Sequence, residues 1–372
     1  MLQSYAPIIL FTYNRPKHTQ QVLEALIANP LASKSDLYIY QDGAKPQATY
    51  NDKNAIQEVK TFIKEIIVKN AQTPLFGSIT FIERESNLGL ADSIIDGVTY
   101  VMSKYGKAII LEDDIVVSPV FLNYMNAALS KYENEPKVWG ISAWSYPIDT
   151  THLGDCYFWR LFHCWGWASW ENRWQHYKRD ITWALENFSQ EDINYINLDG
   201  IAPYFNQVID NAKGKIKTWA IFNCLIAYKH NALVLCPSTS YIQQIGFDGS
   251  GVHCGQEGEI FNPAHINTKF PITYPNEIIE SATALERIKA FELSLKKPIY
   301  IRAYGKLIRI SQSLGQKVNQ FINGGGAEHN IIISYPALTH AYPFSYNHTP
   351  PLLYLYTYYN HPLPYPNKKE HK

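Results

Sequence analysis

The sequence predicts an α/β fold, with a mostly parallel mixed β-sheet flanked by helices. Short apolar runs of strand length alternate with segments of helical periodicity along the N-terminal part of the chain. Several of these runs stop abruptly at polar or acidic residues, as strands do at the ligand-binding edge of an open α/β sheet. The apolar fraction of 46% is large enough for a sizeable core.

The first strand-helix-strand unit is expected directly after the N-terminus. The apolar run at residues 7–12 predicts the first strand. Pro16 fits the first turn of a helix over residues 15–27, because its ring presets the helical backbone angle. Residues 37–40 predict the second strand, which the turn-forming pair Asp42-Gly43 closes.

The pattern then repeats. Residues 55–68 have the apolar spacing of an amphipathic helix, and residues 78–82 predict the third strand. A further helix over residues 90–104 leads to the short apolar run 108–111, which predicts the fourth strand. Strands and helices of these lengths in alternation indicate βαβ units.

The second half of the chain is less regular. Its expected elements are a helix at 119–132, a strand at 138–143, a helix at 219–228 and a strand at 232–236. Residues 154–183 are dense in aromatic side chains, and residues 243–258 form a glycine-rich stretch that predicts a loop.

The C-terminal part is expected to add helices and then a tail. Residues 278–295 and 296–322 have helical patterns, and the second carries basic residues among apolar ones. This second segment could lie on an anionic membrane surface, or it could pack on the core with a solvated basic face. From residue 324 the chain is rich in Tyr, Pro and His and is predicted to be disordered.

Composition excludes several classes of protein. Lys and Arg (33) balance Asp and Glu (33), so no general basic field is present for binding nucleic acid. No secretory signal and no apolar run of transmembrane length occur, which predicts a cytoplasmic protein. Five cysteines without metal-ligand spacing indicate buried thiols in a reducing compartment. The 27 Tyr and 9 Trp could stack on sugar rings or simply fill the core.

The most informative feature is the acidic triplet Glu112-Asp113-Asp114, which directly follows the apolar run 108–111. Adjacent carboxylates repel one another, but a hard cation at a strand end would gather them. The carboxyl edge of such a sheet is also where ligands bind. The triplet therefore indicates a metal ion that holds a diphosphate, with a solvated acidic turn as the alternative.

Polar residues also follow the first three strands. Arg15 can pair bidentately with phosphate, or it can be solvated beside a helix-capping Asn14. Asp42 can accept from a base N–H or a ribose hydroxyl, or it can serve a tight turn. Ser93 can face a nucleotide, and Asn87 can bind one or act as an N-cap. All these residues are expected at one edge of the sheet.

An ordered set of motifs carries a family resemblance. Its members are Phe11-Thr-Tyr-Asn-Arg-Pro16, Gln41-Asp-Gly43, Asn87-Leu-Gly-Leu-Ala91, Leu111-Glu-Asp-Asp114, Val138-Trp-Gly-Ile-Ser-Ala-Trp144, Trp165-Gly-Trp167 and Gly251-Val-His-Cys-Gly-Gln256. In this order they resemble nucleotide-sugar glycosyltransferases of the GT-A fold, and are similar to bacterial glycosyltransferases related to N-acetylglucosaminyltransferase I. The resemblance covers residues 7–271, and the acidic triplet matches the family's D-x-D motif.

The resemblance implies roles for individual residues. Asp114 would be the direct ligand of Mn²⁺ (or Mg²⁺), and Asp42 would read the uracil of a UDP-sugar. Residues 246–256 would close over the donor. The residues expected to contact the donor are Thr12, Asn14, Arg15, Asp42, Asn87, Ser93, Glu112 and Asp113.

The family's catalytic base is an aspartate that follows the tryptophan-rich block. Asp180 is the best local match in this chain, with Glu171 and Glu186 as competitors. A carboxylate in this role takes the proton of the acceptor hydroxyl as that hydroxyl attacks the anomeric carbon. A single displacement of this kind inverts the configuration.

The resemblance implies a function and a domain plan. The expected activity is metal-dependent, inverting transfer from a nucleotide sugar to a glycan or glycolipid, in bacterial surface polysaccharide or lipopolysaccharide synthesis. The protein would be cytoplasmic, with peripheral contact to the inner membrane. Residues 1–275 would form the catalytic domain, with a nucleotide-binding half (1–118) and an acceptor half (119–275). A helical extension (276–323) and the disordered tail (324–372) would follow.

Two other functions remain open at this stage. A sugar-nucleotide nucleotidyltransferase also uses a parallel sheet and acidic metal ligands, but it would need a glycine-rich phosphate loop after the first strand. A non-catalytic carbohydrate-binding protein would use the aromatic content without a metal. The intact acidic triplet counts against this last interpretation.

Overall fold

The computed structural model describes residues 5–249 and 256–296. All of them lie in one compact unit, Met1–Lys297. The expected helix 296–322 and the tail from residue 324 lie outside the described residues, as does most of the motif 251–256.

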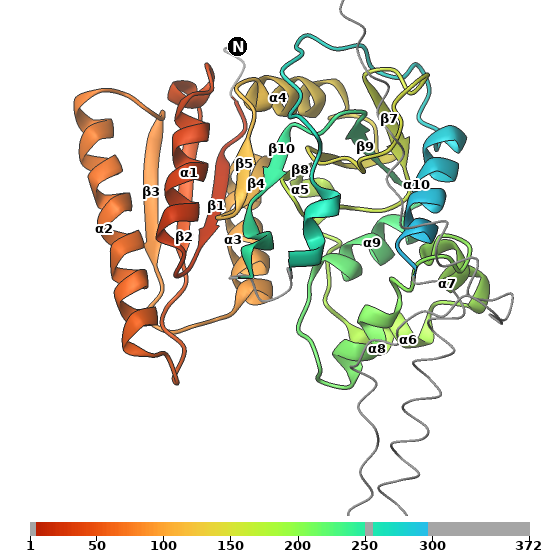
Figure 1. The fold of residues 1–372 in the computed structure, drawn as a ribbon, viewed down its shortest axis with the longest axis horizontal. Coiled ribbons are helices and arrows are strands. Elements are labelled where there is room, and N and C mark those ends of the chain that lie inside the picture. The colour runs from red at the N-terminus through yellow and green to blue at the C-terminus, as the bar shows by residue number, and fades with distance from the viewer. Residues whose placement is uncertain (1–4, 250–255, 297–372) are drawn as a thin grey trace, which may run out of the picture. The chain divides into compact units, whose positions relative to one another are not determined.

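The core of the unit is an eight-stranded mixed sheet (Figure 1). The strand order is β3-β2-β1-β4-β8-β6-β9-β7. Four neighbouring strands, β3, β2, β1 and β4, run parallel, whereas β8 and β7 run antiparallel to their neighbours. The strands are β1 (Ile8–Thr12), β2 (Asp36–Gln41), β3 (Ser78–Glu83), β4 (Lys107–Glu112), β6 (Val138–Ser142), β7 (Cys156–Trp159), β8 (Trp167–Trp170) and β9 (Leu233–Pro237).

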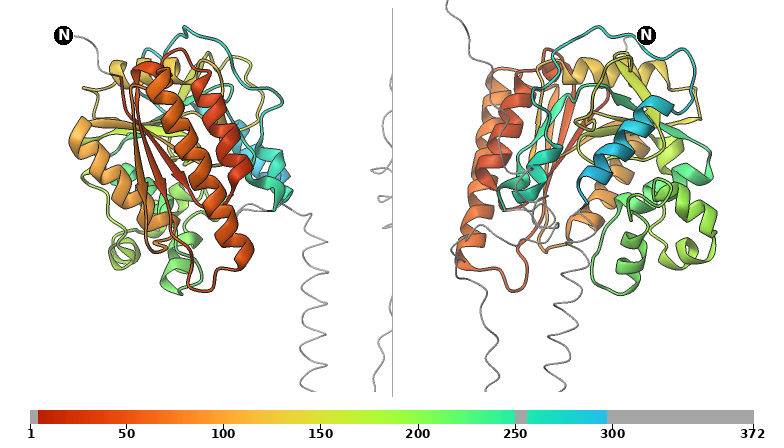
Figure 2. Two further views of the ribbon diagram at one scale, coloured as in Figure 1. Left: turned by 90° about the vertical axis from the view of Figure 1, so that its left-hand side faces the viewer. Right: turned by 45° about the vertical axis from the view of Figure 1, so that its right-hand side comes forward.

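Helices cover both faces of the parallel half. Helices α1 and α2 lie on one side of these strands and α3 lies on the other (Figure 2, left). The expected helices and strands are confirmed, with ends that differ by a few residues, except that α2 is clearly longer than its apolar pattern. The helices of the first half are α1 (Pro16–Ile27), α2 (Tyr50–Gln72), α3 (Leu90–Tyr105) and α4 (Phe121–Lys131).

The C-terminal half holds elements that the sequence did not predict. The aromatic stretch contains β7 and β8, and β8 is inserted antiparallel between β4 and β6. A small second sheet pairs β5 (Ile115–Val117) with β10 (Ile242–Gln244), so the stretch 243–258 is not only loop. The remaining helices are α5 (Glu171–Trp174), α6 (Ile181–Glu186), α7 (Gln190–Ile196), α8 (Asn206–Ala212), α9 (Ala220–Lys229) and α10 (Ala282–Ser294), with short 3₁₀ turns at Gly246–Asp248 (η2) and Gln256–Phe261 (η3).

Helix α10 is part of the core of this unit. Its residues Ala284 and Ile288 are fully buried, and Ser281 donates from its backbone N–H to the carbonyl of Phe158 in β7 at 2.9 Å. Residues 278–296, expected to begin the helical extension 276–323, contact the sheet through β7.

Most tryptophans are packed inside the unit. Seven of the nine have side chains that are at most 5% exposed, and only Trp165 and Trp183 are half-buried. Of the two roles that the sequence left open for the tryptophans, filling the core applies to these seven. The buried set is Trp139, Trp144, Trp159, Trp167, Trp170, Trp174 and Trp219.

Two smaller expectations can be compared with the structure. Cys156, Cys224 and Cys236 are buried thiols, as expected. Within residues 5–249 and 256–296, no helix is long and apolar enough to span a bilayer.

Candidate functional site

The carboxyl ends of the four parallel strands meet at one edge of the sheet. The register pairs Phe11 with Glu112 and Gln41 with Glu83, so β1 to β4 end at the same level. The loops that follow these strands carry the residues selected from the sequence. Parallel pairing therefore brings the polar motifs to one edge, as expected.

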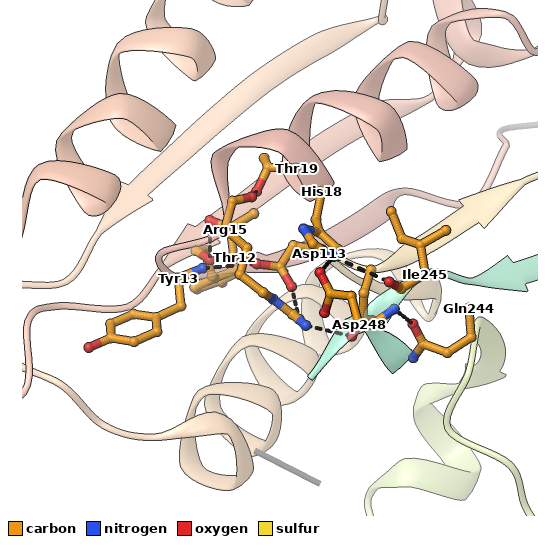
Figure 3. Close-up of polar contacts among 12 residues, drawn as sticks. Thr12, Tyr13, Arg15, His18, Thr19, Asp113, Gln244, Ile245 and Asp248 are labelled. Carbon is orange, nitrogen blue, oxygen red and sulfur yellow. Dashed lines mark hydrogen bonds and ion pairs between the residues drawn. The ribbon is translucent and has the colours of Figure 1, made fainter. Parts of the chain in front are cut away.

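Arg15 holds the acidic turn together. Its guanidinium pairs with the carboxylate of Asp113 and, through Nη1, with Oδ2 of Asp114 at 2.9 Å (Figure 3). The backbone N–H of Tyr13 donates to Asp113 Oδ2 at 3.4 Å. The loop after β1 and the turn after β4 thus form one charged cluster, which we call the acidic turn (Glu112, Asp113 and Asp114).

Burial raises the free energy needed to ionise the carboxyl groups of Glu112 and Asp113. The pKa of Glu112 is raised to about 8, first by burial and then by the negative charges of Asp114 and Asp113, with Arg15 acting in the opposite direction. Burial also raises the pKa of Asp113 to about 6, more than Arg15 lowers it. One guanidinium is shared among three carboxyl groups, so an added cation would stabilise their charged forms.

The segment Ile242–Asp248 packs on the acidic turn. Strand β10 pairs with β5, and the N–H of Ile245 donates to the backbone carbonyl of Asp114 at 2.9 Å. Gly246 lies so close that a Cβ atom there would be 2.4 Å from Asp114 Oδ2, so only glycine fits without movement. His18 of α1 contacts the other side of the segment, at 3.3 Å from the carbonyl of Ile245 and 3.2 Å from Asp248 (Figure 3).

The acidic turn fits a metal bound through a single protein ligand. Asp114 is 4% exposed, and its Oδ1 is a buried oxygen without a hydrogen-bond partner among the described residues. Such an oxygen is a ready ligand for a hard cation. No cluster of three or more ligating side chains exists in residues 5–249 and 256–296.

Asp42 ties two strand ends together. Its carboxylate accepts from the backbone N–H groups of Gly43 at 3.0 Å and of Leu88 and Gly89 at 2.8 Å each. Gly89 has φ of +78°, a conformation that favours glycine. Asn87 reinforces this join by donating to the carbonyl of Gly43 at 2.8 Å. These two residues lie at the expected edge, and their hydrogen bonds shape the loops after β2 and β3.

The remaining expected donor contacts lie at the same edge. Thr12 ends β1 and donates weakly to the carbonyl of Tyr40 at 3.4 Å. Asn14 donates to Asp52 of α2 at 3.1 Å, so it does not cap α1, whose N-cap position is Arg15 without a capping side chain. Ser93, in the first turn of α3, is buried, and its hydroxyl has no hydrogen-bond partner among the described residues.

The three base candidates are dispersed. Glu171 follows β8, and the register pairs Trp170 with Lys107 at the amino end of β4. Glu171 is therefore roughly 17 Å from the acidic turn, on the opposite edge of the sheet. Glu186 is exposed at the end of α6, and Asp180 caps the start of that helix by accepting from Trp183 N–H at 2.8 Å.

Asp180 is nevertheless on the side of the sheet that faces the site. Its neighbour Arg179 donates to the carbonyl of Thr218 at 2.9 Å, and Lys217 pairs with Asp92 in the first turn of α3. That turn follows β3 at the carboxyl edge. The side chain of Asp180 is 45% exposed and is 3.9 Å from Lys178, which leaves it accessible.

Sequence reasoning missed several residues around the acidic turn. His18 and Gln244 support the segment that covers Asp114, and the N–H of Gly246 donates to Gln244 Oε1 at 2.7 Å. Trp165 is the partly exposed member of the aromatic block that reaches this region, with its ring 5.7 Å from that of Phe247. Only the glycine at position 246 carried a signal that could have indicated close approach.

The part of the chain that forms this sheet edge matches the model of a known protein family. The model of the GNT-I family matches residues 2–184, just under half of the chain, and this range contains β1 to β4 and the acidic turn. The expected resemblance to a glycosyltransferase family is confirmed over this part of the chain. The relation to bacterial members stays a prediction.

Individual relatives are distant. Over 145 residues the chain is 25% identical to the alpha-1,3-mannosyl-glycoprotein 2-beta-N-acetylglucosaminyltransferase of Arabidopsis thaliana. The match covers 38% of this chain and 31% of the relative, so the chain spans about a third of that protein. The similarity is therefore to part of an N-acetylglucosaminyltransferase.

Two solved structures have a general likeness to the fold. One is the mannosyltransferase PcManGT from Pyrobaculum calidifontis in complex with GDP-Man and Mn²⁺, with 13% identity and a TM-score of 0.31 over 61% of this chain and 70% of that one. The other is the glycosyltransferase GlyE of Streptococcus pneumoniae TIGR4, with 9% identity and a TM-score of 0.30 over 59% and 42%. Both TM-scores are low, so neither likeness bears on the site.

Proposed function

We propose that this protein is a metal-dependent, inverting glycosyltransferase that moves a sugar from a nucleotide sugar, most simply a UDP-sugar, to a glycan or glycolipid hydroxyl. The observation that carries the proposal is Oδ1 of Asp114 in the acidic turn after β4, which is buried and has no hydrogen-bond partner within residues 5–249 and 256–296. Support comes from the family match, which includes this turn.

The chain's own residues would bind and orient the donor. Asp114 would hold Mn²⁺ or Mg²⁺, and a bound cation neutralises the charge that develops on the leaving diphosphate. Arg15 lies next to this position and can donate two parallel hydrogen bonds to phosphate oxygens. Ser93 and the loops held by Asp42 lie at the same edge, where the nucleotide would bind. Gly246 brings its segment against the metal ligand and helps to exclude water.

The acceptor and the location in the cell belong to the proposal as well. We expect a surface polysaccharide or lipopolysaccharide precursor as acceptor, and a cytoplasmic protein in peripheral contact with the inner membrane. Trp165 is a partly buried aromatic ring near the covering segment, and it is the residue that we propose to stack on a sugar. The basic segment 296–322, which could lie on a membrane surface or pack on the core, lies outside the described residues apart from Lys296.

A thermal-shift screen of nucleotide sugars with and without Mn²⁺ tests the donor and metal together. A UDP-sugar with Mn²⁺ at about 100 times its dissociation constant should stabilise the fold by about 2.7 kcal/mol, which raises Tm by roughly 5–10 °C. Mn²⁺ with UDP-glucose or UDP-N-acetylglucosamine is the first pair to measure, with EDTA and free sugars as controls. Stabilisation by free sugars that survives EDTA would support a carbohydrate-binding protein instead.

Asp180 is our proposed catalytic base, and Asp180→Asn tests it without loss of the helix cap. Asparagine caps a helix as well as aspartate does, so Tm should change little. Turnover should fall by roughly 10²–10⁴-fold, because the base is gone, while donor affinity stays unchanged. The measurement is single-turnover transfer beside calorimetric donor binding, with Asp210→Asn in α8 as the exposed control. An unchanged rate in Asp180→Asn would remove this residue from the mechanism.

A further inference from the structure

Arg15 forms an ion pair with Asp114, the residue that the proposed function assigns as the metal ligand. Its Nη1 lies 2.9 Å from Asp114 Oδ2, and its other terminal nitrogen pairs with Asp113. The two carboxylates are 4% and 6% exposed at their side chains, whereas Arg15 is 17% exposed. The guanidinium thus lies against both carboxylates of this buried cluster.

Only one carboxylate oxygen of Asp114, Oδ1, is available to a divalent cation among the contacts of the described residues. Oδ2 is in contact with Arg15 and is also covered by Gly246, where an added Cβ would be only 2.4 Å away. Oδ1 is buried and has no hydrogen-bond partner among the described residues. A divalent cation on Oδ1 would lie within a few ångströms of the guanidinium, and two like charges at that separation in a buried site repel strongly.

A bound donor would offer Arg15 new hydrogen-bond acceptors, the oxygens of its diphosphate. It is in the loop between β1 and α1, at the sheet edge where the diphosphate would lie, and its guanidinium suits phosphate oxygens as well as carboxylates. A diphosphate would give the guanidinium new acceptors at the moment the cation takes over the carboxylates. Without a nucleotide, moving Arg15 away would leave its buried charge uncompensated.

We infer that Arg15 is an internal counter-ion, which a divalent cation must displace from Asp114, so that the metal binds with the nucleotide rather than before it. The inference rests on the proposed function, because it takes Asp114 as the metal ligand. It makes Arg15 a positioning residue that couples the two binding events. Coupling of this kind is reciprocal, so the metal raises nucleotide affinity by the same factor as the nucleotide raises metal affinity.

The test measures Mn²⁺ binding directly, with the electron paramagnetic resonance signal of free Mn²⁺ as readout and no transfer reaction. Wild type should bind Mn²⁺ weakly alone and at least tenfold more tightly with UDP. Arg15→Gln should bind Mn²⁺ alone at least tenfold more tightly than wild type, and UDP should then add little. Arg15→Lys keeps the charge and should bind Mn²⁺ alone as weakly as wild type. Arg287→Gln, which removes a partly exposed arginine paired with Asp149, is the matched control.

The variants distinguish failure of the counter-ion inference from failure of the metal assignment to Asp114. If Asp114→Asn loses Mn²⁺ binding but Arg15→Gln binds Mn²⁺ alone no better than wild type, the counter-ion inference is wrong while the metal site stands. If Asp114→Asn binds Mn²⁺ as wild type does, the metal ligand itself is wrong and both proposals fall. A melting curve for each variant shows whether the fold is retained, and Arg15→Lys provides the comparison if Arg15→Gln does not fold.

Discussion

Replacing Asp114 by asparagine is expected to lower sugar transfer by about a thousandfold or more and to remove the stabilisation by Mn²⁺ with donor. Asparagine keeps the shape of the side chain but loses the negative charge at Oδ1, the buried oxygen to which we assign the metal. A metal contributes several kcal/mol to the stabilisation of a leaving diphosphate, and each 1.36 kcal/mol is a factor of ten in rate. Initial rates and Mn²⁺-dependent thermal shifts measure the two effects.

The matched control is Asp210→Asn, since Asp210 is an aspartate in α8 that pairs with Lys215 at the surface. It should leave both the rate and the thermal shift unchanged. The Asp114 variant should fold, because the neutral side chain relieves the repulsion among the three acids of the turn. A folded Asp114→Asn protein with wild-type rate would refute the metal assignment.

Replacing Arg160 by leucine is expected to lower the free energy of unfolding by about 3 kcal/mol and Tm by roughly 6–12 °C. Arg160 at the end of β7 is 7% exposed and forms two hydrogen bonds to Glu280, at 2.7 Å and 2.5 Å. Its guanidinium also stacks on the ring of Tyr195, with 3.9 Å to the centroid. The substitution leaves the carboxylate of Glu280 without its main partner at the attachment point of α10.

Urea unfolding curves of Arg160→Leu and Arg287→Gln provide the comparison. Arg287 of α10 is 26% exposed, pairs with the exposed Asp149 and also donates to the carbonyls of Asp149 and Thr151. Loss of an ion pair near solvent costs less than about 1 kcal/mol. The double variant Arg160→Leu with Glu280→Leu should recover part of the lost stability, because no buried charge then remains unpaired. If Arg160→Leu costs no more than Arg287→Gln, the α10 segment is not held by this pair.

The parallel half of the fold was predictable from the sequence because its rules are local. Each of the strands β1 to β4 is a short apolar run between helices of clear periodicity, and parallel neighbours need such crossovers. The antiparallel strand β8 was not predictable. Its four residues, Trp167–Trp170, have no alternation because both of their faces are buried. Its insertion between β4 and β6 depends on contacts across the sheet.

The position of each candidate base relative to the site likewise depends on long-range contacts that the sequence does not reveal. Asp180, Glu171 and Glu186 are close in sequence, and only the local match to the family resemblance favoured Asp180 over the other two. Pairing of β8 with β4 puts Glu171 at the far edge, whereas the contacts of Arg179 and Lys217 keep the region of Asp180 toward the site. The direction of one short strand decides this, and it is fixed by long-range pairing.

The sequence by itself determined the sheet edge and its polar residues: the acidic turn, Arg15, Asp42 and Ser93 follow strands that must end together, because parallel strands share their direction. Only the tertiary structure decided how those residues are used. Asp42 bonds three backbone N–H groups, Arg15 pairs with Asp113 and Asp114, and Gly246, distant in the chain, lies against the carboxylate of Asp114. The reason is physical: strand ends follow from local periodicity, whereas the partner of a buried charge depends on which distant segments the packing of the core brings next to it.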